Sequence, residues 1–196
     1  MAHRVDHDPT RSAPGDLRHH HAFWSRSHAG IASGLRRIDD ERRPLTATAD
    51  HILGHLEEEA ARSAKETPGG RSLLKACANS GRSVWIVSNN SERAIQVYLQ
   101  IQGLQGYVAG VFGRIPAAPS TMKPNPRLLA DAMNAAMAKP VECIFIGDAV
   151  RDVQAGNAVG VATIGYANKP GKDGALRRAG AVFVTDSVQM IADSLT

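Results

Sequence analysis

The sequence predicts an α/β protein with a doubly wound, Rossmann-like parallel sheet, and three observations support this prediction. Short apolar runs alternate with segments of helical periodicity along most of the chain. The apolar runs are continuous, as expected for strands that helices cover on both faces. Polar residues directly follow several of these runs, at the carboxyl ends of strands where such sheets bind their ligands.

From residue 46 onward, the predicted elements follow one another regularly. Glycine and proline residues mark several of the helix ends, because they interrupt the helical pattern. We expect strands over residues 83–88, 107–112, 142–147, 161–165 and 181–184. We expect helices over residues 46–65, 71–80, 92–102, 126–138, 150–159, 174–179 and 187–195. In the first helix, Ile52, Leu53 and Leu56 should form the apolar side, opposite Glu57–Glu59.

The first 45 residues differ in composition from the rest. All eight histidines lie within the first 55 residues, and this stretch is rich in arginine, proline and serine. It shows little periodicity, so residues 1–45 are predicted to be irregular or disordered. The triplet His19–His21 could bind a metal, but it has no partner at ligand spacing, and a solvated triplet is the simpler interpretation.

The overall composition is that of a globular protein, with 43% hydrophobic and 21% charged residues. Basic residues are interleaved with acidic ones, so we expect no nucleic-acid partner, although the formal charge of +4 suits an anionic ligand. No apolar run approaches the roughly 20 residues that span a bilayer, so we expect no membrane partner. Cys77 and Cys143 have apolar neighbours, which predicts buried free thiols and a cytoplasmic location.

Two polar clusters suggest phosphate chemistry. Ser88 and Asn89 directly follow a predicted strand, and a hydroxyl with free N–H groups at a helix start can bind phosphate. The alternative is that this cluster only caps the next helix. Lys123 is followed by Pro124, which would hold it as a preset cation able to neutralise a phosphoryl group. The alternative here is a surface lysine in a turn.

A third cluster follows the predicted strand 142–147. Gly147 permits a sharp turn, Asp148 then projects from the strand tip, and Asp152 lies on the first turn of the next helix. Two carboxylates placed in this way can hold a hard cation such as Mg²⁺. The alternative is that the carboxylates are favoured only by the dipole at the helix N-terminus.

The order of these clusters resembles motifs two, three and four of the haloacid dehalogenase superfamily, and in particular its phosphoglycolate-phosphatase-like members. The resemblance covers about residues 66–196. It implies that Ser88 and Asn89 bind phosphoryl oxygens and that Lys123 clamps the phosphoryl group. It also implies that Asp148 ligates Mg²⁺, that Asp152 supports the metal site, and that the substrate is a small phosphorylated metabolite. Residues 67–196 would be the catalytic core, and residues 46–66 a remnant of a helical cap that is reduced or absent.

The resemblance also implies a nucleophilic aspartate, the first of two in a D-x-D motif at the end of the first, central strand. Asp6 and Asp8 fit the letters of this motif and would be the nucleophile and the general acid and base, and would also contribute to the metal site. The residues before Asp6 include His3 and Arg4, which are unsuited to a buried strand. Three interpretations therefore stay open. The chain is a Mg²⁺-dependent phosphohydrolase that works through an aspartyl-phosphate, a catalytically inactive module of this family that binds phosphate or a protein partner, or a truncated, non-enzymatic fragment with no selected site.

Overall fold

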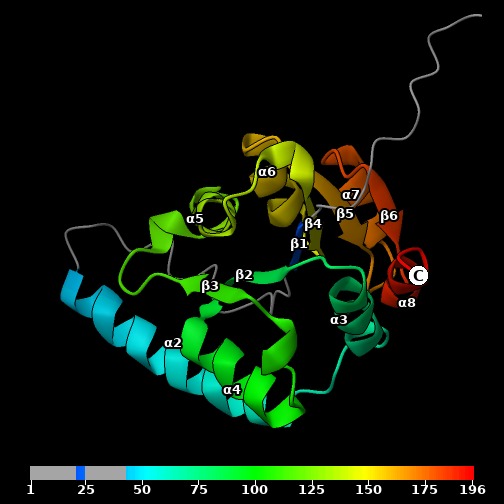
Figure 1. Ribbon diagram of the computed structural model, residues 1–196. Coiled ribbons are helices and arrows are strands. Elements are labelled where there is room, and N and C mark those ends of the chain that lie inside the picture. Colours follow the sequence, from blue (N-terminus) through cyan, green and yellow to red (C-terminus); the bar gives the residue numbers. More distant parts are fainter. Residues whose placement is uncertain (1–20, 25–42) are drawn as a thin grey trace, which may run out of the picture.

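The computed structural model describes residues 21–24 and 43–196, which form a parallel sheet of six strands with helices on both sides (Figure 1). The strand order is β3-β2-β1-β4-β5-β6, and every neighbouring pair is parallel. The strands are β1 His21–Trp24, β2 Val84–Ser91, β3 Gly110–Arg114, β4 Cys143–Gly147, β5 Ala162–Tyr166 and β6 Phe183–Thr185. The predicted doubly wound α/β fold is confirmed.

The helices agree with the sequence-based boundaries to within a few residues. They are α2 Arg43–Ser63, α3 Gly70–Asn79, α4 Glu92–Gln102, α5 Arg127–Ala136, α6 Val150–Ala158, α7 Lys172–Arg178 and α8 Val188–Asp193. Short 3-10 helices cover Gln105–Tyr107, Pro119–Thr121 and Pro140–Glu142. Within the described part of the chain, no helix combines the length and the apolar character needed to cross a bilayer.

Strand β1 lies within a stretch that was expected to be irregular. It occupies the centre of the sheet, where Phe23 is in register with Trp85 of β2 and Phe145 of β4. The four residues His-Ala-Phe-Trp have polar neighbours in the sequence, so they carry no strand signal of their own. Hydrogen bonding to a strand on each side stabilises these residues as a strand although their own pattern does not predict one, because strand formation depends strongly on tertiary context.

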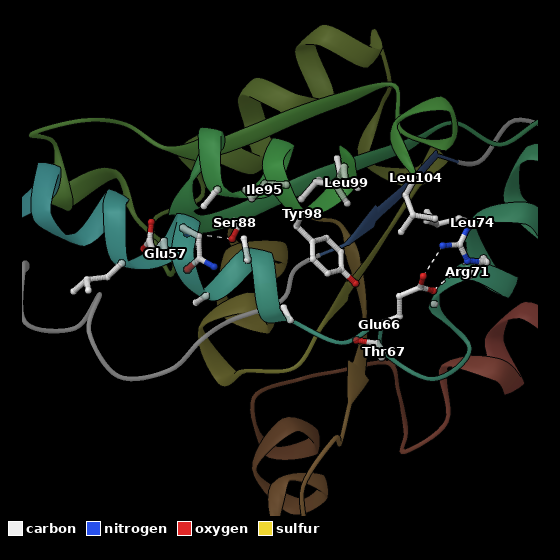
Figure 2. Close-up of a pocket in the computed structure, with 18 residues that line it drawn as sticks. Glu57, Glu66, Thr67, Arg71, Leu74, Ser88, Ile95, Tyr98, Leu99 and Leu104 are labelled. Atoms are coloured by element: carbon white, nitrogen blue, oxygen red, sulfur yellow. Dashed lines mark hydrogen bonds and ion pairs between the residues drawn. The ribbon is translucent and has the colours of Figure 1, made fainter. Parts of the chain in front are cut away.

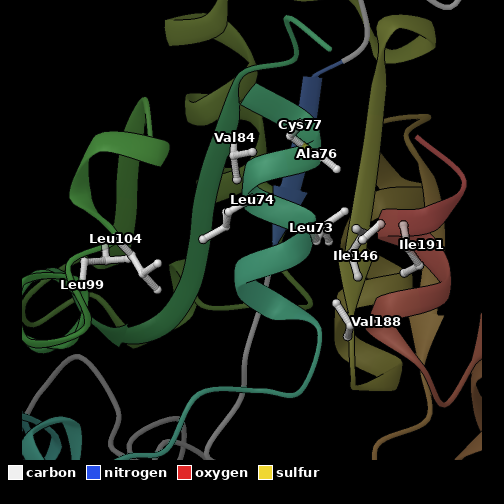
Figure 3. Close-up of a cluster of buried hydrophobic side chains, with 11 residues drawn as sticks. Leu73, Leu74, Ala76, Cys77, Val84, Leu99, Leu104, Ile146, Val188 and Ile191 are labelled. Carbon is white, nitrogen blue, oxygen red and sulfur yellow. The ribbon is translucent and has the colours of Figure 1, made fainter. Parts of the chain in front are cut away.

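The core divides into clusters on the two faces of the sheet. On one face, Leu73 and Leu74 of α3 pack with Val84 and Ile146 of the sheet and with Val188 of α8 (Figure 3). On the other face, residues of α5 pack against β2 and β4. The buried members of this second cluster are Val87, Leu128, Leu129, Ala132, Met133, Cys143, Phe145 and Val161. The two clusters fix the positions of β2 and β4, and these strands in turn fix the polar residues that follow their apolar stretches.

Both cysteines are buried free thiols, as predicted. Burial raises the pKa of Cys77, and it raises the pKa of Cys143 to about 11. Both thiols therefore remain protonated at neutral pH, and they serve as small core residues.

Helix α2 faces the core differently from the prediction. Leu53 is buried, but Ile52 and Leu56 are exposed, and Glu57 turns inward to meet Arg114 of β3. The apolar pattern alone could not reveal this, because the inward orientation of Glu57 depends on a buried arginine 57 residues away in the sequence. α2 packs along α4, and the two helices lie side by side in Figure 1.

Candidate active site

The predicted site residues Ser88, Lys123 and Asp148 lie at the carboxyl edge of the sheet. Ser88 lies on β2, Asp148 directly follows β4, and these two strands flank β1. Lys123 comes from the connection between β3 and α5, next to a cis Lys123–Pro124 peptide bond. All three residues are almost fully buried, with exposed fractions of 1% for Ser88, 1% for Lys123 and 3% for Asp148.

The helix cap and the predicted phosphate-binding hydroxyl are different residues. Ser91 is the N-cap of α4, and its hydroxyl accepts a hydrogen bond from the Ala94 N–H at 3.3 Å. Ser88 lies three residues earlier, and its hydroxyl accepts a hydrogen bond from the Asn90 N–H at 3.1 Å. Because Ser91 supplies the cap, capping does not account for the buried Ser88 within β2.

Asn89 supports Lys123 through its side chain. Its Oδ1 accepts a hydrogen bond from the Lys123 N–H at 2.8 Å, and its Nδ2 donates to the Lys123 carbonyl at 3.2 Å. The side-chain amide is thus engaged with the backbone of the lysine. Asn89 positions Lys123, and a phosphate contact from this residue would have to come from its backbone N–H.

Lys123 is a buried cation held by a fully buried acid. Its Nζ lies 2.8 Å from Oδ1 of Asp152 and donates to the Val87 carbonyl at 2.9 Å. Burial lowers the pKa of Lys123, and the negative charges of Asp152 and Asp148 oppose this shift only in part. The alternative of a surface lysine in a turn is wrong, because the side chain is 1% exposed.

Gly147 and Asp152 fit each other closely. A Cβ atom at residue 147 would lie 2.3 Å from the Cβ of Asp152, so only glycine lets the carboxylate approach the strand end. Oδ2 of Asp152 accepts a hydrogen bond from the Ala149 N–H at 3.0 Å, while Oδ1 pairs with Lys123. Asp152 therefore orients the lysine and the first turn of α6.

Asp148 has two partners that the sequence did not single out. Its Oδ2 accepts hydrogen bonds from Asn168 Nδ2 at 2.8 Å and from Lys172 Nζ at 3.0 Å. Lys172 also donates to the Asp148 carbonyl at 2.7 Å. Both partners come from the polar segment that follows β5. This segment directly follows the predicted strand 161–165. Polar residues in that position are candidate site residues, as Ser88 and Asp148 are, so the sequence did contain a signal for Asn168 and Lys172.

Arg114, at the end of β3, is a second group that the sequence did not reveal. Its side chain is 2% exposed, and Nε lies 2.5 Å from Oδ1 of Asp50. Nη1 lies 2.7 Å from Oε1 of Glu57 and donates to the Asn89 carbonyl at 2.9 Å. A continuous chain of contacts therefore runs from α2 through Arg114 and Asn89 to Lys123.

The described residues do not complete a metal site by themselves. In residues 21–24 and 43–196, no group of three or more histidine, cysteine, aspartate or glutamate residues could hold a metal. Asp148 is a candidate ligand, because Mg²⁺ commonly binds one or two carboxylates together with water and substrate phosphate oxygens, although its Oδ2 already accepts hydrogen bonds from Asn168 and Lys172. Asp152 fits less well as a direct ligand, because its two oxygens pair with Lys123 and Ala149.

The predicted nucleophile lies outside the described residues, as do Asp8 and the His19–His20 pair. Strand β1 begins at His21, well after Asp6 and Asp8 in the sequence. The residues that directly follow β1 in the sequence are Ser25, Arg26 and Ser27. Neither carboxylate of the Asp6-x-Asp8 sequence is therefore attached to the end of this central strand.

Sequence comparisons agree with the predicted family. A family model described as haloacid dehalogenase-like hydrolase matches residues 8–160. A phosphoglycolate phosphatase from Rhodospirillum rubrum is 27% identical over 174 residues, which cover 86% of this chain and 69% of that protein. A phosphoglycolate phosphatase from Vibrio vulnificus is 28% identical over 143 residues, which cover 73% of this chain and 58% of that protein.

Solved structures share the fold. A predicted phosphatase from Clostridium acetobutylicum superposes with a TM-score of 0.71 at 18% identity, covering 84% of this chain and 76% of that one. A HAD family hydrolase from Deinococcus radiodurans, determined with bound phosphate and sodium, has a TM-score of 0.64 at 20% identity. That match covers 92% of this chain and 96% of the other.

Proposed function

We propose that this chain, which belongs to the family of haloacid dehalogenase-like hydrolases, binds a small phosphomonoester at Ser88, Lys123 and Asp148 and hydrolyses it with Mg²⁺. The observation that carries the proposal is the meeting of a hydroxyl, a buried ammonium group and a carboxylate at one edge of the sheet. These are the groups needed to bind, neutralise and orient a phosphoryl group.

Each described residue has a distinct role in the proposed site. The Ser88 hydroxyl and the Asn89 backbone N–H donate to phosphoryl oxygens, since the Asn90 and Ser91 N–H groups already donate to Ser88 Oγ and to Glu57. Lys123 neutralises the charge that develops on the phosphoryl group, while Asp152 and Asn89 hold the lysine in place. Asp148 would bind Mg²⁺, which supplies further positive charge to the phosphoryl oxygens when it is bound.

Hydrolysis also needs a nucleophile, for which Asp6 is the candidate. An Asp6 carboxylate oxygen would attack phosphorus and form an aspartyl-phosphate, and the alcohol would leave with a proton from Asp8. Asp8 would then take a proton from water as the water attacks phosphorus. This attack would release inorganic phosphate and restore the Asp6 carboxylate.

The second candidate function is phosphate binding without turnover. The position of β1 favours it, because Asp6 and Asp8 precede this central strand and Ser25-Arg26-Ser27 follow it. Without a carboxylate opposite Lys123, the site could bind and neutralise a phosphoryl group but could not form the aspartyl-phosphate. The phosphoryl-binding residues are the same in both candidates.

A phosphatase assay separates the two functions. The test compares wild type, Asp6→Asn and Asp148→Asn on a generic phosphomonoester with Mg²⁺. Turnover by the wild type that both substitutions abolish would support the hydrolase. Turnover abolished only by Asp148→Asn would point to a different nucleophile. A silent wild type that still binds inorganic phosphate would establish the binding module, and a silent wild type without phosphate binding would refute both functions.

A further inference from the structure

A cavity of about 230 Å³ lies between α2, α3, α4 and strand β2 (Figure 2). Most of its lining is aliphatic or aromatic and includes Ala61 of α2, Leu74 of α3, Ile86 of β2, and Ile95 and Tyr98 of α4. An apolar cavity of about 150 Å³ is enough for a benzene ring. This cavity therefore has room for an apolar group of at least that size.

One end of the cavity reaches the proposed phosphoryl site. Ser88 lines the cavity, and Figure 2 shows it beside Glu57, at the end away from the pair formed by Glu66 and Arg71. A ligand with its phosphoryl group at Ser88 can therefore extend its remaining atoms along the apolar walls without leaving the protein. This continuity distinguishes the cavity from a packing defect elsewhere in the fold.

The charged groups of the cavity are engaged with protein partners. Arg71 Nη2 lies 2.5 Å from Oε1 of Glu66 and donates to the Gln102 carbonyl at 2.6 Å. Glu57 pairs with Arg114 and accepts a hydrogen bond from the Ser91 N–H. A carboxylate inside the cavity would face two glutamates and an arginine that is already paired, so the lining disfavours an anionic group there.

We propose that this cavity holds an apolar group of the phosphomonoester whose phosphoryl group lies at Ser88. The inference rests on the proposed function, and it adds a substrate class: esters whose leaving alcohol is apolar. Each buried methylene should improve affinity about fourfold until the cavity is full. A short ester that carries a second acid should gain nothing from the cavity.

Non-hydrolysable phosphonates test the inference independently of turnover. Calorimetric titrations with methyl-, butyl- and hexylphosphonate should show affinity rising with chain length, while phosphonoacetate should bind no more tightly than methylphosphonate. Binding of all the alkylphosphonates with equal affinity would overturn this inference and leave the proposed function intact. No binding of any phosphonate or of inorganic phosphate would overturn both.

Substitutions that fill the cavity locate the effect. Ala61→Leu places extra atoms in the cavity and should remove the gain from methyl- to hexylphosphonate. Ala60→Leu, at a more exposed lining position, should reduce the gain and serves if Ala61→Leu does not fold. Ala47→Leu makes the same change on an exposed position of α2 outside the cavity and should keep the full gain. An undiminished gain in a folded filling variant would show that the alkyl chain binds elsewhere.

Discussion

Replacing Arg114 with methionine should destabilise the protein by about 3–5 kcal/mol, the usual effect of removing one partner from a buried ion pair. The arginine side chain is 2% exposed, and its acidic partners Asp50 and Glu57 are 14% and 10% exposed. The substitution removes the positive charge that compensates the two carboxylates. It also removes the hydrogen-bond donor to the Asn89 carbonyl. For a chain of this length the melting temperature should fall by roughly 6–20 °C, at about 2–4 °C per kcal/mol.

Urea unfolding followed by circular dichroism measures this effect. Two variants serve as controls. Arg177→Met removes an arginine whose pair with Asp173 is solvent-exposed, so it should change stability little. Arg114→Met combined with Asp50→Asn and Glu57→Gln leaves no buried charge unpaired, so it should be more stable than Arg114→Met alone. Equal stabilities for Arg114→Met and wild type would refute the inference that this network ties α2 to the site.

Three further predictions concern buried groups. Lys123→Met should destabilise the protein by about 3–5 kcal/mol, because Asp152 is 0% exposed and would lose its cationic partner. Adding Asp152→Asn should recover part of that loss, as the same urea unfolding assay can measure. Burial lowers the pKa of Lys123 below its ordinary value of 10.5, so the lysine should lose its charge, and phosphate affinity should fall, as the pH rises through that lowered pKa. A phosphate affinity that stays constant up to pH 10.5 would contradict the role of Lys123 as the phosphate-binding cation. Because its pKa is raised to about 11, Cys143 should react with iodoacetamide at pH 8 only after unfolding, as mass spectrometry of the labelled peptide can establish.

The parts of the fold that could be predicted from the sequence are those with a local pattern. Strand β2 begins with a continuous apolar run that Ser88 follows, and β4 is an apolar run that Asp148 follows, so both the strands and the polar residues were identified. β1 was not identified, because four residues with polar flanks do not produce such a run. Its stability as a strand comes from hydrogen bonding to β2 and β4, which only the assembled sheet supplies.

The supporting contacts of the site could not be predicted, because they join distant segments. Arg114 meets an aspartate 64 residues away, and Lys172 meets an aspartate 24 residues away. No spacing rule connects such pairs before the fold is known. The family resemblance placed Asn89 among the phosphate-binding residues, whereas its side-chain amide is directed at the Lys123 backbone 34 residues along the chain.

The most direct test of the central claim is a calorimetric titration of the protein with inorganic phosphate in the presence of Mg²⁺. The wild type should bind, and Ser88→Ala should weaken binding by about 1.5–3 kcal/mol, the range for losing a hydrogen bond to a charged group. Ser80→Ala, which removes a hydroxyl at the end of α3, should bind like the wild type. Identical phosphate binding by Ser88→Ala and wild type, or no binding by the wild type, would contradict the proposed site.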